Sequence, residues 1–261
     1  MDNLIKLKDF LDNRFEEICS QDFITSDPIS IPHTFNLNQD IEISGFLVSI
    51  LSFGRRSILI AKAKELINIM DNSPYDFIIN ANEKDLLKLT HFKHRTISSE
   101  DIIYIIRFLS KFYKNNDSLE LIFSKFLNTD SINIEKSLIG FHNTIFNGQE
   151  LDFKTRRHLP SPLKGSACKR INMFIRWMVR KDKYNIDFGI WNNIKPSQLI
   201  CPCDIHVINV ANHLKIISQK KSTWKTALEL TNNLKLLNKE DPLKYDFALF
   251  GTGVNNLNIY E

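Results

Sequence analysis

Residues 161–181 read SPLKGSACKRINMFIRWMVRK and combine a short turn with an amphipathic helix. Proline and glycine mark the turn, and a helix is predicted from residue 166 to residue 181. At about 100° per residue, the apolar and polar side chains separate onto opposite faces. The apolar face holds Ala167, Ile171, Phe174, Ile175 and Met178, and the polar stripe holds Lys169, Asn172, Arg176 and Arg180. We therefore expect a helix that packs on a core with one side and is basic on the other.

Lys169 lies in the first turn of this predicted helix, with arginines on its own face. Nearby like charges and the positive end of the helix dipole both favour the neutral amine, which is the nucleophilic form of a lysine. The alternative is that Lys169 only contacts a phosphate. The turn before it, with Lys164, Gly165 and Ser166, offers backbone N–H groups that can accept a phosphate.

Asp204 begins a second segment of interest, residues 201–207, which read CPCDIHV. An aspartate that follows a proline at the start of a helix is a natural N-cap, worth about 1 kcal/mol. A capping carboxylate can also be catalytic. A metal site made of Cys201, Cys203 and His206 is the other interpretation, although the sequence shows no second ligand cluster.

The basic charge of the chain is concentrated around the predicted helix. Residues 154–183 hold ten Lys and Arg and one Asp, a charge of +9, whereas the remaining residues sum to −5. A basic window on an acidic body indicates a binding site for a polyanion such as nucleic acid. A solvated basic surface helix would give the same count.

The rest of the chain predicts an all-α fold. Eight Gly and eight Pro are few for 261 residues, and no strand-like alternation of any length occurs. Apolar residues recur at helical spacing in most of the sequence. Helices are predicted at residues 4–18, 40–51, 57–70, 85–89, 99–113, 118–126, 134–146, 166–181, 204–217, 223–236 and 242–250, with a connector at 27–38.

No apolar run is long enough to span a bilayer, and residues 1–15 mix charged and apolar side chains, unlike a signal peptide. A cytoplasmic protein is therefore expected. In that compartment the four cysteines do not predict a disulfide framework.

In these segments the chain resembles the helix-hairpin-helix DNA glycosylases, of the endonuclease III type and the archaeal 8-oxoguanine glycosylase. The segment GSACKRIN (165–172) resembles their hairpin and Schiff-base lysine, and PCDIHV (202–207) resembles their aspartate segment. Residues 40–64 resemble the early helix pair that flanks the pocket, and residues 244–251 resemble the last helix. Across nearly the whole chain, the likeness is greatest to a bacterial family of unknown function that is built on this plan.

The resemblance implies a two-lobed all-α bundle, with one lobe near residues 40–181 and the other formed by 1–39 and 182–261. It also implies a monomer that removes a damaged base from double-stranded DNA, an oxidised purine as the first expectation, with AP-lyase activity. Lys169 and Asp204 would be catalytic, and the DNA contacts would come from Lys164, Gly165, Ser166, Arg170, Arg176 and Arg180. Some of these arginines are alternatively pocket or packing residues.

The sequence departs from the glycosylase pattern in four ways. Ala167 replaces the second hairpin glycine, and 35 residues separate Lys169 from Asp204, a spacing closer to the archaeal enzyme. The inserted residues 183–199 include Phe188 and Trp191, which are expected to shape a base pocket. No cysteine cluster ends the chain, so no iron–sulfur centre or other cofactor is expected.

Two other functions compete with a glycosylase. One is a DNA-binding module that has kept the fold and lost catalysis. The other is a metal-dependent nuclease that uses Cys203, Asp204 and His206.

Overall fold

The computed structural model describes residues 2–19, 21–147 and 153–254, and this part of the chain consists of helices joined by loops, without a β-sheet. Its first half contains α1 (Asp2–Ile18), α2 (Gln21–Ser26), η1 (Pro28–Ser30), η2 (Pro32–Thr34), α3 (Asn38–Leu51), α4 (Arg56–Ile69), α5 (Pro74–Asn80), α6 (Glu83–Leu87) and α7 (Ser99–Tyr113). The second half contains α8 (Glu120–Ser124), α9 (Glu135–Ile145), α10 (Phe153–Arg156), η3 (Pro162–Lys164), α11 (Lys169–Val179), η4 (Pro196–Gln198), α12 (Ile205–His213), α13 (Trp224–Lys235) and α14 (Lys244–Val254). The all-α prediction is confirmed.

The predicted helix ends agree best where capping side chains are present. Ser98 accepts a hydrogen bond from the amide of Asp101, whose carboxylate accepts one from the amide of Ser98, and this capping box begins α7. Asp204 and Thr223 cap α12 and α13 in the predicted places. By contrast, α2 and α5 were not predicted, because each has only about two turns and shows no amphipathic periodicity.

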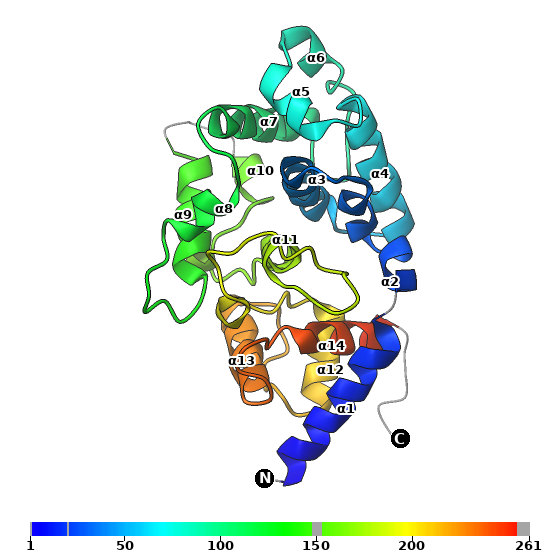
Figure 1. Ribbon diagram of the computed structural model, residues 1–261, viewed down its shortest axis with the longest axis vertical. Coiled ribbons are helices and arrows are strands. Elements are labelled where there is room, and N and C mark those ends of the chain that lie inside the picture. Colours follow the sequence, from blue (N-terminus) through cyan, green and yellow to red (C-terminus); the bar gives the residue numbers. More distant parts are fainter. Residues whose placement is uncertain (1, 20, 148–152, 255–261) are drawn as a thin grey trace.

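Helix α11 lies in the middle of the molecule (Figure 1). Helices α3 to α7 lie above it in that view, and α12, α13 and α14 lie below it together with α1. The most extensive helix contacts join α11 to α3, and α14 to both α1 and α12. Residues 28–34, which the predicted division places with the second lobe, pack as η1 and η2 against α3.

One cluster of buried apolar side chains runs through both groups of helices. It includes Phe46 of α3, Phe174 of α11 and Phe247 of α14, each nearly inaccessible to solvent. Phe174 contacts both Phe46 and Trp191 edge-on, with ring centroids 5.4 and 5.3 Å apart. The predicted apolar face of α11 therefore packs on the core. No helix in the described part of the chain is long and apolar enough to cross a bilayer.

Candidate functional site

A cavity of about 700 Å³ opens beside the N-terminal half of α11. Its wall comes from separated segments, namely the connector around Asp27, the turn between α3 and α4, residues 157–177, the start of α12, Ser222 and α14. Sequence-distant segments thus meet at one hollow, which is the usual setting of a ligand site.

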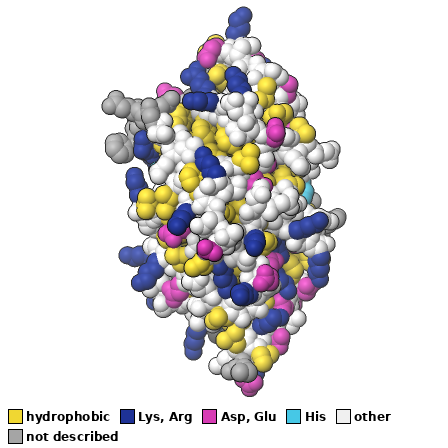
Figure 2. Space-filling model, turned by 60° about the vertical axis from the view of Figure 1, so that its left-hand side comes forward, with side chains coloured by type: hydrophobic (Ala, Val, Ile, Leu, Met, Phe, Trp, Pro, Cys, Tyr) yellow, Lys and Arg dark blue, Asp and Glu magenta, His cyan; other side chains and the backbone are white. Residues whose placement is uncertain are grey.

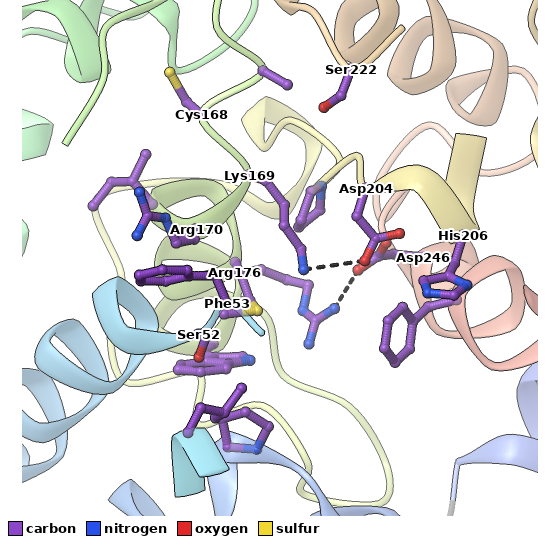
Figure 3. Close-up of a pocket in the computed structure, with 18 of the residues that line it drawn as sticks. Ser52, Phe53, Cys168, Lys169, Arg170, Arg176, Asp204, His206, Ser222 and Asp246 are labelled. Atoms are coloured by element: carbon purple, nitrogen blue, oxygen red, sulfur yellow. Dashed lines mark hydrogen bonds and ion pairs between the residues drawn. The ribbon is translucent and has the colours of Figure 1, made fainter. Parts of the chain in front are cut away.

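Lys169 and Asp204 face each other in this cavity (Figure 3). Lys169 Nζ lies 3.2 Å from Asp204 Oδ2, and the two side chains are 31% and 18% exposed. The other carboxylate oxygen, Oδ1, accepts a hydrogen bond from the amide of Val207 at 3.0 Å. Asp204 therefore caps α12 with one oxygen and faces the lysine with the other.

The backbone before Lys169 is held in an uncommon conformation. Gly165 has φ +74°, and Cys168, the residue before the helix, has φ +49°. Left-handed backbone at a residue other than glycine costs roughly 1–2 kcal/mol per residue. The chain is anchored on both sides of this turn, because the Gly165 carbonyl accepts from the amide of Trp224 at 2.9 Å and Ser166 Oγ accepts from the amide of Cys168. The turn thereby places Lys169 at the first position of α11.

The predicted set of DNA contacts needs a correction, because two of its members, Arg176 and Arg180, are buried. Arg176 forms a hydrogen-bonded ion pair with Asp246, and its Nε lies 3.4 Å from Asp187. Arg180 donates to Asp241 at 2.9 Å and to Asp187 at 3.2 Å. Burial raises the pKa of Asp187 to about 6, although both arginines act to lower it. Arg176 also lines the cavity, but the charges of both arginines are neutralised by carboxylates and are not left unpaired for phosphates.

The pairing also changes the expected charge around Lys169. Arg176 and Arg180 do not present unpaired positive charge on its face, since Asp246, Asp187 and Asp241 neutralise them. The basic window is therefore not one surface. Lys183, at its far end, pairs with Glu16 of α1 at 2.6 Å. On the face shown in Figure 2, lysines and arginines are intermixed with acidic and apolar side chains.

Arg170 differs from the two buried arginines because no carboxylate of the described residues pairs with it. It donates to the carbonyl of Ile50 at 2.7 Å, and its guanidinium lies 5.0 Å from the centre of the Phe53 ring. Burial lowers the pKa of Arg170 to about 10, so it stays charged at neutral pH. Lys164 and Gly165 are exposed, and Ser166 lines the cavity. Arg170 and Ser166 at the cavity wall, and Lys164 and Gly165 in the turn that leads to it, remain candidates for DNA contacts.

Two other predictions about the site are not supported. Phe188 and Trp191 do not line the cavity: Phe188 packs on His33, and Trp191 Nε1 donates to the buried Glu42 at 2.7 Å. The inserted residues 183–199 therefore contribute to the core. Cys203 is fully buried whereas His206 lines the cavity, and the described residues contain no group of three or more potential metal ligands. The nuclease alternative thus has no site in this part of the chain.

Two cavity residues were missed by sequence reasoning. Asp27 caps η1 through the amide of Ile29, and burial raises the pKa of its carboxyl group. Trp177 is fully buried, and its indole N–H has no hydrogen-bond partner among the described residues. An Asp-Pro pair in a connector and a tryptophan within a helix are common, so neither gave a signal before the fold was known.

Comparisons with known proteins place the chain in a family without a described activity. No curated protein matches the chain, and no solved structure does. The family model described as "Protein of unknown function (DUF2400)" matches residues 27–255, which include every cavity residue named above. This match covers most of the sequence, and the chain therefore belongs to the DUF2400 family of proteins of unknown function.

Proposed function

We propose that this protein is a DNA glycosylase that removes a damaged base through a lysine Schiff base and then acts as an AP lyase. The observation that carries the proposal is the 3.2 Å approach of Lys169 Nζ to Asp204 Oδ2 inside a cavity. An amine nucleophile beside a carboxylate is the arrangement that such a reaction requires.

The reaction would begin with transfer of a Lys169 proton to the leaving base, directly or through Asp204, which leaves Asp204 ionised. The amine nitrogen then forms a bond to the sugar C1′, and the bond between C1′ and the base breaks, with the electron pair leaving on the base. The Asp204 carboxylate stabilises the positive charge that develops on the sugar. Ring opening gives an imine between Lys169 and C1′, and loss of a 2′ proton then expels the 3′ phosphate.

The cavity has the size and lining that a flipped base needs. Ligand pockets are typically about 300–1,000 Å³, and this one is about 700 Å³. A base must leave the duplex stack before chemistry at C1′ can occur. The unpartnered N–H of Trp177 would find an acceptor on that base, and the Asp27 carboxyl group offers a polar partner in the same cavity.

Phosphate contacts would come from Lys164, Gly165, Ser166 and Arg170. Arg170 carries a charge that no described carboxylate neutralises, at the wall next to Lys169. Phosphate binding by this group would place the strand so that one nucleotide faces the cavity. The damaged base that we expect first is an oxidised purine, a choice that rests on the resemblance to the archaeal enzyme.

Borohydride trapping on a panel of lesion-bearing duplexes tests the proposal. Borohydride reduces an imine to a stable amine, so an enzyme with this mechanism becomes covalently joined to DNA. Lys169→Gln should abolish trapping and keep DNA binding, whereas Lys221→Gln, at an exposed lysine near the cavity residue Ser222, should trap normally.

The outcomes distinguish the candidate functions. Trapping that persists in Lys169→Gln would move the nucleophile to another lysine, with Lys164 next. Binding without trapping or base release on every lesion would identify a DNA-binding module without catalysis.

A further inference from the structure

A second, smaller hollow lies between α5, α6 and α7. Its volume is about 260 Å³, and its apolar lining includes Ile78 of α5, Leu86 of α6 and Ile106 of α7, each at most 8% exposed. None of the described residues lines both this hollow and the cavity beside α11. In Figure 1, α5 and α6 lie at the top of the molecule, above α11 and the cavity. The hollow therefore takes no part in the proposed reaction.

Small side chains help to keep this hollow open. Ala81, at the junction of α5 and α6, and Ser110 of α7 both line it and are partly buried. A large side chain at either position would take up part of its volume. The hollow can therefore admit an apolar group from outside the chain.

The rim of the hollow carries positive charge that the described residues do not neutralise. Arg107, Lys111 and Lys114 follow one another at intervals of four and three residues, which places them on one face of α7. Arg107 donates to both carboxylate oxygens of Glu83, at 3.1 and 2.8 Å, so these two charges cancel. Lys111 and Lys114 are exposed, and no carboxylate of the described residues pairs with either.

We propose that this hollow is a docking site for an acidic segment of a partner protein. The segment inserts one large apolar side chain between α5, α6 and α7 and places carboxylates on Lys111 and Lys114. A volume of about 260 Å³ is below the usual range of ligand pockets, about 300–1,000 Å³, and suits a single side chain. This inference is independent of the proposed function, because it uses neither Lys169 nor Asp204.

The lining of the hollow favours a protein segment over a nucleic acid or a membrane. Its apolar residues are aliphatic and offer no ring on which a base could stack. Membrane binding uses apolar side chains that project from a surface, whereas Ile78, Leu86 and Ile106 are recessed. Carboxylates complement the two unpaired lysines, and exposed ion pairs of this kind support a weak, transient complex.

Methyl NMR of the intact protein tests the docking site. The probes are peptides of four aspartates with leucine, isoleucine, phenylalanine or tryptophan at the centre. At least one peptide should shift the methyl signals of Ile78, Leu86 and Ile106 saturably and leave that of Leu59, which lines the other cavity, in place. The same peptide with alanine at its centre should cause no shift, because it has no large side chain to bury.

Variants at the rim and in the hollow separate the two parts of the recognition. The double variant Lys111→Glu, Lys114→Glu should weaken peptide binding by about tenfold, because two exposed ion pairs are replaced by repulsion. Lys136→Glu, at an exposed position on α9, should bind as wild type. Ser110→Phe should fill the hollow and abolish the methyl shifts, whereas Ser110→Ala should keep them.

The inference is overturned if none of the four peptides shifts these methyl signals. It is also overturned if the double lysine variant and Ser110→Phe both bind like wild type. Decanoate and an oligothymidylate strand serve as the other occupants, and a shift by either of them without a shift by any peptide would make the hollow a site for a small acid or a nucleic acid instead. No lesion or catalysis is needed, so this result is separate from the fate of the glycosylase proposal.

Discussion

Two ion pairs involve the same face of α11, but one is partly exposed to solvent and the other is buried. Lys169 pairs with Asp204 at the mouth of the cavity, and Arg176, about two turns later, pairs with Asp246 inside the protein. The first pair is 31% and 18% exposed, whereas the second is 8% and 4% exposed. In the sequence both cations belong to one polar stripe. They differ only in how far other segments of the folded chain bury them.

The difference in burial changes what each pair can do. A buried cation must keep its partner, because removing one member leaves an uncompensated charge in a medium that solvates it poorly. A partly exposed pair contributes little to stability and remains accessible to a ligand. We therefore propose a chemical role for Lys169 and Asp204 and a structural role for Arg176, Asp246 and Arg180.

The largest effect is expected from Asp204→Asn, which separates the two roles of this residue. Asn is as good an N-cap as Asp, so the melting temperature should scarcely move. The negative charge beside Lys169 is lost, so base removal should fall by orders of magnitude. Circular dichroism melts and single-turnover assays on one lesion duplex measure both quantities.

Asp204→Ala is the matched variant, because it should lose activity and about 1 kcal/mol of stability as well. Cleavage by Asp204→Asn at the wild-type rate would make Asp204 only a cap. Lys169 alone would then be insufficient support for a glycosylase.

The buried pair should show the reverse pattern. Arg176→Met leaves Asp246 without its cationic partner and Asp187 with Arg180 alone, and should lower the free energy of unfolding by about 3–5 kcal/mol. Urea unfolding followed by circular dichroism measures the change. Adding Asp246→Asn to Arg176→Met should recover part of the loss.

Arg170→Met is the control for that experiment, since no described carboxylate depends on Arg170. It should cost clearly less stability than Arg176→Met. Equal losses in the two variants would mean that the contrast between buried and cavity-facing cations is wrong.

A smaller effect is expected on DNA affinity when an exposed lysine of the hairpin is removed. Each phosphate contact contributes about −0.9 to the slope of log K against log salt on B-DNA. Lys164→Ala should therefore flatten the slope by about that amount, while Lys6→Ala, on the exposed side of α1, should not change it. Fluorescence anisotropy at several salt concentrations gives both slopes, and identical slopes would exclude Lys164 as a phosphate contact.

The smallest effect is expected from Trp177→Phe. A typical hydrogen bond contributes about 0.5–1.5 kcal/mol, so losing the indole N–H should lower kcat/KM on the preferred lesion by roughly 2–10-fold. Stability should not fall by the cost of a broken hydrogen bond, because no described residue accepts from this N–H in the free protein. An unchanged kcat/KM would mean that the base does not reach Trp177.

Sequence reasoning was most accurate where a local signal controls a local structure. Periodic apolar residues and capping side chains located α7, α12 and α13 to within a few residues. The pairing of Lys169 with Asp204 was also expected, from the resemblance to the glycosylases. Both ends of α11 were predicted too long, because the left-handed Cys168 and the extended Arg180 stop the helix inside the amphipathic pattern.

Burial of charge was the main property that sequence could not supply. Arg176 and Arg180 have the same local pattern as a basic surface stripe, and the carboxylates that neutralise them come from residues 182–187, 241 and 246. Phe188 and Trp191 were predicted to line a pocket because their burial, too, depends on segments that are distant in the sequence. No local pattern tells a pocket aromatic from a core aromatic.

The sequence by itself determined an all-helical chain with a lysine at the start of one helix and an aspartate at the start of another. These features depend on periodicity and capping, which act over a few residues. Only the tertiary structure decided which cations face a cavity, which are neutralised inside, and that Ile78, Leu86 and Ile106 line a second hollow. The physical reason is that solvation and contact depend on segments that are far apart in the chain and come together only on folding.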